Sequence, residues 1–243
     1  MRHRTAARVV GVLFIMATVP FSLSVVLLEP VVGVPDFLAQ ASLSKARVAG
    51  GVFLELVNHI SVVGIAVVIY PVLKPFSERL ALGYVAARSI EAVLFTVATL
   101  HLLTLVFVGH EFVAAGAPPS SYFHTLGSVL LAGHDWDNAA LAFTAFSVGA
   151  LMLNYLLYRT RLVPRWISAF GFLAAGSILA ARVMVISGIE LPSATVTMLD
   201  APIFLQEMVF AVWLIVRGFD ASALAARPQE PEFSAEWPNT TEG

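Results

Sequence analysis

The sequence has few charged residues and no cysteine. Asp, Glu, Lys and Arg make up 12% of its 243 residues, whereas hydrophobic residues make up 58%. The absence of cysteine excludes disulfide bonds, a thiolate nucleophile and cysteine-ligated zinc or iron–sulfur sites. The net charge of −2 provides no basic surface for nucleic acid, so we expect no nucleic-acid partner. The mean hydropathy of +0.85 is typical of a membrane protein rather than of a soluble domain.

Long apolar runs separate the few charged clusters. A bilayer core of about 30 Å is crossed by roughly 20 apolar residues in a helix, and the sequence holds six runs of this kind. It therefore predicts an all-α polytopic membrane protein with six transmembrane helices. The runs are Val9 to Leu28, Val48 to Leu73, Leu80 to Val108, Asn138 to Tyr158, Ile167 to Ile186, and a last one from about Thr195 or Ala201 to Val216.

The distribution of Lys and Arg predicts that both termini are cytoplasmic. If the N-terminus is cytoplasmic, that side receives ten of the 14 Lys and Arg residues, and the opposite side receives only Lys45 and Arg47. The remaining two, Arg88 and Arg182, lie within spans. The first run resembles a signal peptide but lacks a nearby small-residue cleavage site, so we expect it to remain as the first helix.

The remaining segments are short. We expect residues 1–219 to form the transmembrane domain and residues 220–243 a cytoplasmic tail, in which Arg227 to Gly243 is rich in Pro and Glu and is expected to be disordered. On the outer side, Asp36 to Ala46 and Ser120 to Gly133 have mixed polarity, which predicts interfacial helices or ordered loops.

Polar residues within the spans are the candidate ligand-binding residues. Ionisable groups in a bilayer cost several kcal/mol unless they face the bundle interior and find partners. Glu55, Asn58 and His59 share one helix face, as do Arg88 and Glu91, because their spacings are i, i+3 and i+4. The candidate set is Glu55, His59, Arg88, Glu91, Arg182, Gln206 and Glu207.

Depth along the helices predicts how these charges pair. Arg182 and Glu207 fall at nearly one level on antiparallel neighbours, which makes them the preferred ion pair, and Arg88 then pairs with Glu91 or Glu55. Three carboxylates face two guanidiniums. The surplus acid is protonated, or it is balanced by a proton on His59 or by a cationic ligand or ion. The alternative is a satisfied polar cluster that only fixes the helix register.

The last run contains Asp200 and Pro202. A proline-interrupted span is one sequence indicator of a membrane binding site. We favour the simpler interpretation, in which Asp200 is the N-cap and Pro202 occupies the first turn, where its missing N–H costs nothing.

Histidine and acidic residues gather on the outer side. They show no H-x-x-x-H or H-E-x-x-H spacing, so we interpret them as solvated loop residues and expect no metal site. The group is His101, His110, Glu111, His124, His134, Asp135 and Asp137. The sequence also lacks the motifs of hydrolases, ATPases and dinucleotide-binding enzymes.

Several segments occur in an order that is typical of one membrane family. They are Leu73–Lys74, Leu82–Arg88 with Glu91, Val113–Pro118, Asp135–Trp136, Leu162–Trp166, Gln206–Met208 and Trp213–Phe219. Together they resemble DUF4386, a bacterial membrane family of unknown function, from the first helix to Phe219. The resemblance implies a multi-pass protein of the bacterial inner membrane, and it brings no activity or cofactor. His59 and His134 belong to none of these segments.

The leading hypothesis is binding or translocation of a small ion, or of a polar or amphipathic ligand, at the buried Glu/Arg site. In it Glu55, Glu91 and Glu207 accept protons or cations, and Arg88 and Arg182 orient them or bind an anionic group. One alternative is a membrane-embedded enzyme acting on a lipid or isoprenoid, with a buried Glu as general acid or base. The other is a noncatalytic partner or sensor subunit. The sequence specifies no catalytic residue, substrate or oligomeric state.

Overall fold

The computed structural model describes residues 2–118 and 122–226, and this part of the chain is helical without any strand. Six of its helices are long and apolar enough to cross a membrane, which confirms the predicted all-α fold with six spans. The elements are α1 (Arg2–Val32), α2 (Phe37–Leu43), α3 (Lys45–Leu73), α4 (Glu78–Ala114), α5 (Tyr122–Asp135), the π-helix η1 (Trp136–Ala142), α6 (Phe143–Thr160), α7 (Arg165–Ile186), α8 (Ser193–Val216) and α9 (Ala221–Ala225).

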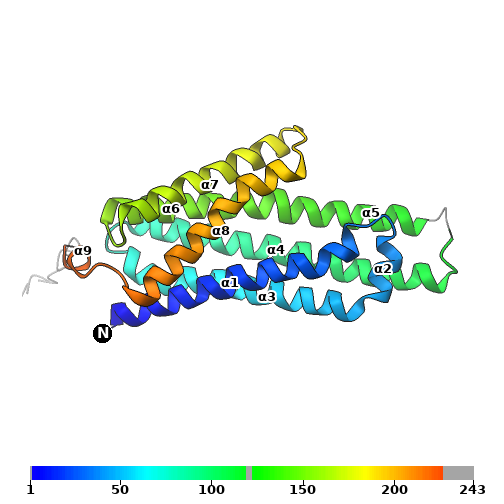
Figure 1. Ribbon diagram of the computed structural model, residues 1–243, viewed down its shortest axis with the longest axis horizontal. Coiled ribbons are helices and arrows are strands. Elements are labelled where there is room, and N and C mark those ends of the chain that lie inside the picture. The colour runs from blue at the N-terminus through cyan, green and yellow to red at the C-terminus, as the bar shows by residue number, and fades with distance from the viewer. Residues whose placement is uncertain (1, 119–121, 227–243) are drawn as a thin grey trace, which may run out of the picture.

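The long helices form a closed ring. Each packs against the next in the order α1, α3, α4, α6, α7 and α8, and α8 returns to α1 (Figure 1). Side chains that point into this ring are shielded from lipid by the helices around them. The largest apolar core cluster includes Ile65, Ile69, Leu157, Ile167 and Leu214.

Helix α4 and the continuous helix formed by α5, η1 and α6 are both longer than a bilayer core is thick. At about 1.5 Å per residue, the 37 residues of α4 span roughly 55 Å, well over the 30 Å of a hydrocarbon core. The α5 helix continues through η1 into α6 as one span, Tyr122–Thr160. We had expected Ser120 to Gly133 to be a separate interfacial helix or loop. From Tyr122 onward it is instead the first part of the fourth span.

The short helix α2 covers the projecting part of α4, so of the interfacial helix or ordered loop predicted between Asp36 and Ala46 the structure has a helix. Gly109 of α4 makes this contact possible, because a Cβ at that position would overlap the carbonyl oxygen of Leu38. Leu38, Leu102 and Leu105 belong to a second apolar cluster at this end of the bundle.

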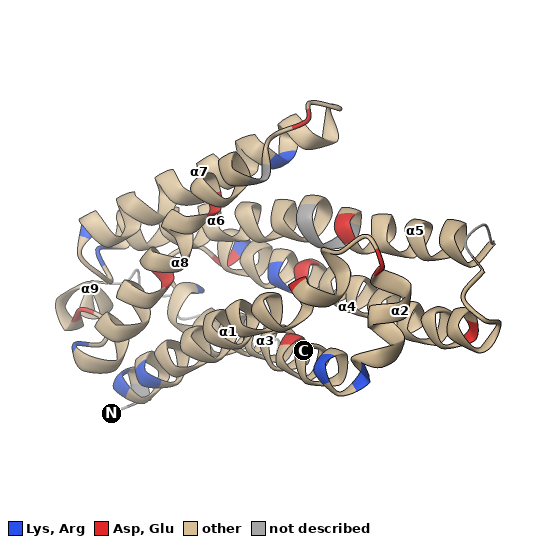
Figure 2. Ribbon diagram, turned by 45° about the vertical axis from the view of Figure 1, so that its right-hand side comes forward, with Lys and Arg blue, Asp and Glu red and all other residues tan. Residues whose placement is uncertain are grey.

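Most Lys and Arg residues lie at the helix ends (Figure 2). The start of α1 and the end of α8 lie at the same end of the bundle, together with α9 (Figure 1). We call it the arginine-rich end, because Arg4, Arg161, Arg165 and Arg217 lie there. That it faces the cytoplasm stays a prediction.

The expected domain boundary after residue 219 does not coincide with a break in the packing. Phe219 and Ala223 are buried in the same core cluster, and the Asp220 side chain caps α9 by accepting a hydrogen bond from the Ala223 N–H at 2.9 Å. The transmembrane packing therefore continues through α9. The tail predicted from Arg227 to Gly243 lies outside the described residues.

The contact between α1 and α8 yields the first testable prediction. A Cβ added at Gly11 would lie 2.6 Å from the Ala211 carbonyl oxygen and 2.8 Å from Cγ1 of Ile215. Gly11→Ala therefore pushes the helices apart, and we expect it to lower the stability by about 1–3 kcal/mol. The measurement is thermal unfolding in detergent. Val12→Leu, which also adds one carbon but at a half-exposed position, is the control and should unfold like the wild type.

Candidate functional site

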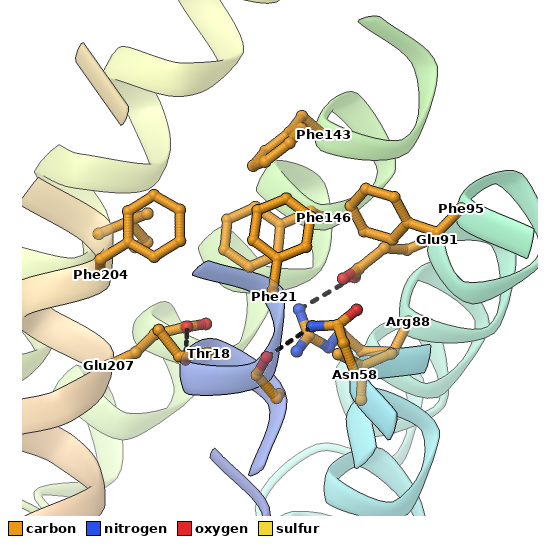
Figure 3. Close-up of a pocket in the computed structure, with 13 residues that line it drawn as sticks. Thr18, Phe21, Asn58, Arg88, Glu91, Phe95, Phe143, Phe146, Phe204 and Glu207 are labelled. Atoms are coloured by element: carbon orange, nitrogen blue, oxygen red, sulfur yellow. Dashed lines mark hydrogen bonds and ion pairs between the residues drawn. The ribbon is translucent and has the colours of Figure 1, made fainter. Parts of the chain in front are cut away.

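Polar side chains from four helices meet inside the ring. They surround a cavity with about 30 Å³ of room for the centre of a water molecule, which is enough for one or two waters (Figure 3). The polar lining residues are Thr18 of α1, Asn58 of α3, Arg88 and Glu91 of α4, and Glu207 of α8. We call this space the central cavity.

Hydrogen bonds hold these residues in place. Arg88 Nη1 donates to Glu91 Oε2 at 2.9 Å, so Arg88 pairs with Glu91, one of its two expected partners. Thr18 Oγ1 donates to Glu207 Oε2 at 2.8 Å, and Asn58 Nδ2 donates to the Ala17 carbonyl at 3.0 Å. Glu207 also lies within electrostatic range of Arg88. Three helices thus fix the positions of the two acids.

Two buried polar atoms at the cavity have no hydrogen-bond partner among the described residues. They are Asn58 Oδ1 and Arg88 Nε. Asn58 is only 6% exposed and Arg88 2%, so neither atom can be satisfied by bulk water. Buried unpaired polar groups are costly, and they commonly mark a position that a water, an ion or a ligand occupies.

Five phenylalanine rings gather above the polar groups, from four helices (Figure 3). Phe21 lies 5.7 Å from Phe95, 6.0 Å from Phe143 and 6.3 Å from Phe204, measured between ring centroids. Phe146 lies 6.0 Å from Phe143, and the Arg88 guanidinium stands 5.2 Å from its centroid. The cavity is therefore charged on one side and apolar on the other. Sequence reasoning missed all five phenylalanines.

Two prolines adjoin the central cavity. Pro20 lies inside α1 between the lining residues Thr18 and Phe21, and Pro202 lies inside α8 next to the lining residue Ile203. The favoured interpretation of the last run was wrong, because α8 begins at Ser193 and neither Asp200 nor Pro202 is in its first turn. Each proline removes one backbone hydrogen bond, so both helices are locally weakened beside the cavity.

The predicted ion pair between Arg182 and Glu207 was also wrong. Arg182 Nη2 donates to Asp200 Oδ2, and the guanidinium stands 4.9 Å from the centroid of the Phe143 ring. Since α8 starts earlier than we favoured, Asp200 lies within the span and takes the arginine. Glu207 is thereby left to the central cavity.

Gln206 lies beside a smaller space next to the central cavity. Arg88 and Glu207 border both spaces, and the smaller one holds about 10 Å³ of room for a water centre. Gln206 Nε2 is 3.5 Å from both Asn154 Oδ1 and the Ile167 carbonyl oxygen, which are long hydrogen bonds. The predicted residues Arg88, Glu91, Gln206 and Glu207 therefore come together at one place.

Glu55, His59 and Arg182 do not line the central cavity. Glu55 Oε2 accepts a hydrogen bond from Thr99 Oγ1 at 2.6 Å, and the carboxylate lies within electrostatic range of His134. The ring of His59 stacks on Phe95 at 5.6 Å between centroids. Glu55 and His59 therefore make their contacts outside the lining of the central cavity. Arg182 forms its ion pair with Asp200, between α7 and α8.

The outer histidine and acidic residues do not converge. In the part of the chain that the structure describes, no three His, Asp or Glu side chains are placed to hold a metal ion. His134 Nδ1 lies 3.1 Å from Oδ1 of the neighbouring Asp135, and His110 and Glu111 are exposed near the end of α4. The Asp137 side chain lies outside the described ones.

The six apolar helices and the charged cavity within their ring define a polytopic α-helical membrane protein. Residues 9–218 match the family described as Domain of unknown function (DUF4386), and the chain belongs to that family. It is 22% identical over 178 residues to an uncharacterized protein of Archaeoglobus fulgidus, an alignment that covers 73% of this chain and 88% of that protein. No solved structure matches the chain. Because this relative is archaeal, location in a bacterial inner membrane stays a prediction.

The observed pairing of Arg182 yields the second prediction. Asp200→Asn leaves a buried guanidinium without its counter-charge, and we expect it to cost about 3–5 kcal/mol of stability. Combining it with Arg182→Met should recover part of this loss, because no unpaired charge then remains. The measurement is a double-mutant cycle by thermal unfolding in detergent. In the matched cycle of Arg182→Met with Glu207→Gln the effects should add, and strong coupling there would contradict the observed pairing.

Proposed function

We propose that this membrane protein binds a small cation, a proton or a monovalent metal ion, in the central cavity and carries it across the membrane. The observation that supports this most directly is the charge of the lining. Two carboxylates, Glu91 and Glu207, face one guanidinium, Arg88. A surplus acid in a bilayer is stable only with a proton or a bound cation.

Glu207 is the best candidate for the acceptor. Glu91 already has an ion pair with Arg88, and Arg182 is neutralised by Asp200. The hydrogen bond that Glu207 receives from Thr18 comes from a neutral hydroxyl, so it does not cancel the charge. Asn58 Oδ1 adds a neutral oxygen without a partner among the described residues. Carboxylate and amide oxygens are ligands that suit small hard cations as well as protons.

The size of the cavity favours a small ligand. About 30 Å³ accommodates one or two waters or a single small ion, whereas a lipid headgroup or an isoprenoid needs the phenylalanine side chains to move first. This ranks the cation hypothesis above the lipid-modifying enzyme. A partner or sensor subunit needs no flux at all, so transport measurements separate it from the proposal.

Movement of a bound cation requires that the cavity open to each side in turn. Side chains from α1 and α8 line it, and both helices carry a proline near those residues. Proline-broken helices beside a binding site are typical of membrane transporters, because bending there costs fewer backbone hydrogen bonds. We infer that α1 and α8 bend at Pro20 and Pro202 during transport.

The third prediction tests Glu207 directly. Purified protein is reconstituted into vesicles, and gradients of H⁺, Na⁺ and K⁺ are imposed one at a time while a trapped fluorescent indicator reports flux. We expect the wild type to carry at least one of these cations and Glu207→Gln to carry it at least tenfold more slowly, since the amide cannot bind a proton or balance a cation.

Glu190→Gln is the matched control for this experiment. It makes the same chemical change at an exposed position between α7 and α8, and it should transport like the wild type. Absence of flux of all three cations in the wild type, or equal rates in Glu207→Gln, would rule out the proposal.

The fourth prediction separates function from helix register. Arg88→Met combined with Glu91→Leu replaces the buried pair by apolar side chains of similar size, so we expect the protein to stay folded, with an unchanged or higher unfolding temperature. Transport should nevertheless be lost, because Glu207 then lies in an apolar cavity and keeps its proton. If this variant transports at the wild-type rate, the Arg88–Glu91 pair only fixes the register of the helices.

A further inference from the structure

A second candidate site lies at the arginine-rich end, away from the central cavity. A hollow of about 770 Å³ lies between the α6–α7 turn and the segment that follows α8. Arg161, Arg165 and Arg217 line it, together with Trp213 and Asp220. We call it the arginine hollow.

The backbone fixes the shape of this hollow. The Asp220 N–H donates to the Leu162 carbonyl oxygen at 2.9 Å, which ties the segment after α8 to the α6–α7 turn. Arg161 ends α6 in the left-handed conformation with φ of 57°, and Gly218 turns the chain after α8 with φ of 78°. Arg217 is thereby brought to the same surface as Arg161 and Arg165, which lie far before it in the sequence.

The hollow carries a net positive charge. The side chains of Arg161 and Arg217 make no ion pair or hydrogen bond within residues 2–118 and 122–226. Arg165 contacts Tyr158, since its Nε lies 3.4 Å from the carbonyl oxygen and its guanidinium stands 5.0 Å from the ring centroid, but it has no counter-charge in this part of the chain. The lining has one acid, Asp220, so three guanidiniums face one carboxylate. Hydrogen bonds from the Ser222 hydroxyl and the Ala223 N–H hold the pKa of Asp220 below its usual range.

The hollow also lies at the ends of the candidate spans, where a bilayer has its headgroups. It is formed by residues within a few positions of the ends of three spans, Tyr122–Thr160, Arg165–Ile186 and Ala194–Val216. Trp213 lines it and Trp166 is exposed beside it, and tryptophan is enriched at the membrane–water interface. The start of α7 lies at the same place, and of its first N–H groups that of Ile167 donates to the Pro164 carbonyl oxygen at 3.0 Å.

We propose that the arginine hollow binds the phosphate headgroup of an anionic phospholipid. Guanidinium groups bind phosphate oxygens through paired hydrogen bonds, and basic hollows between membrane helices at headgroup depth suit anionic lipids. A lipid fits better than free phosphate because its acyl chains remain in the bilayer beside the apolar outer faces of α7 and α8. This site is independent of the cation proposal.

The fifth prediction tests it by counting bound lipids. The protein is purified in detergent and titrated with phosphatidylglycerol or phosphatidylcholine, and complexes are counted by native mass spectrometry. We expect the wild type to prefer phosphatidylglycerol. Arg161→Gln combined with Arg217→Gln should weaken that binding about thirtyfold, since each arginine near a lipid headgroup contributes roughly fivefold.

The matched control is Arg79→Gln combined with Arg159→Gln. It removes the same charge at the same end of the bundle but outside the hollow, and it should change the affinity less than threefold. Unfolding temperatures of both double variants in detergent without added lipid verify folding.

Three outcomes would overturn the proposal. Equal losses in the two double variants would mean diffuse surface attraction, and equal binding of the two lipids would mean no recognition of charge. Displacement of phosphatidylglycerol by millimolar inorganic phosphate, with loss of this effect in the Arg161/Arg217 variant, would assign the site to a soluble phosphate instead.

Discussion

The cost of an unpaired charge in hydrocarbon is the constraint on which this structure depends. Arg88, Glu91 and Arg182 lie within the spans and are each at most 3% exposed, so their side chains point into the ring of helices. Arg88 finds Glu91 on its own helix, whereas Arg182 finds Asp200 on the next one. The second pair therefore sets the rotation and register of α7 against α8. Apolar packing alone fixes neither, because lipid is as apolar as the helices.

The same constraint explains why a cavity exists at the centre. With Arg88 and Arg182 already paired, Glu207 lies in the ring with a neutral hydroxyl as its hydrogen-bond donor. Phenylalanine rings exclude bulk water on one side, and Asn58 holds a backbone carbonyl of α1 on the other. A dry pocket with more acidic than basic groups attracts a cation for electrostatic reasons. The phenylalanine rings therefore strengthen the electrostatic attraction between the surplus carboxylate and a cation, because they keep water away.

Sequence patterns predicted the spans and gave Glu91 as one of two partners of Arg88, because hydropathy and i, i+3 spacing are local properties. The partner of Arg182 was predicted wrongly because the prediction depended on the residue at which α8 begins. Arg182 lies 17 residues after Arg165, and Asp200 lies 17 residues before Arg217, so the two are level once α8 is continuous. No local sequence pattern distinguishes the five phenylalanines that line the central cavity from those that face outward. Phe107 is 65% exposed and Phe95 5%, although both lie in the same apolar helix. Only the packing of neighbouring helices distinguishes them.

Helix α8 connects the three charged features. It supplies Asp200 to the pair with Arg182, Glu207 to the central cavity and Arg217 to the arginine hollow. That ion pair holds α8 at Asp200, and the hydrogen bond between the Asp220 N–H and the Leu162 carbonyl oxygen holds the segment after its end. Pro202 lies between Asp200 and Glu207, and it removes a backbone hydrogen bond from the helix there. A bend at Pro202 would move Glu207 relative to Arg88, and this is the displacement that the proposed release of a cation from the central cavity requires.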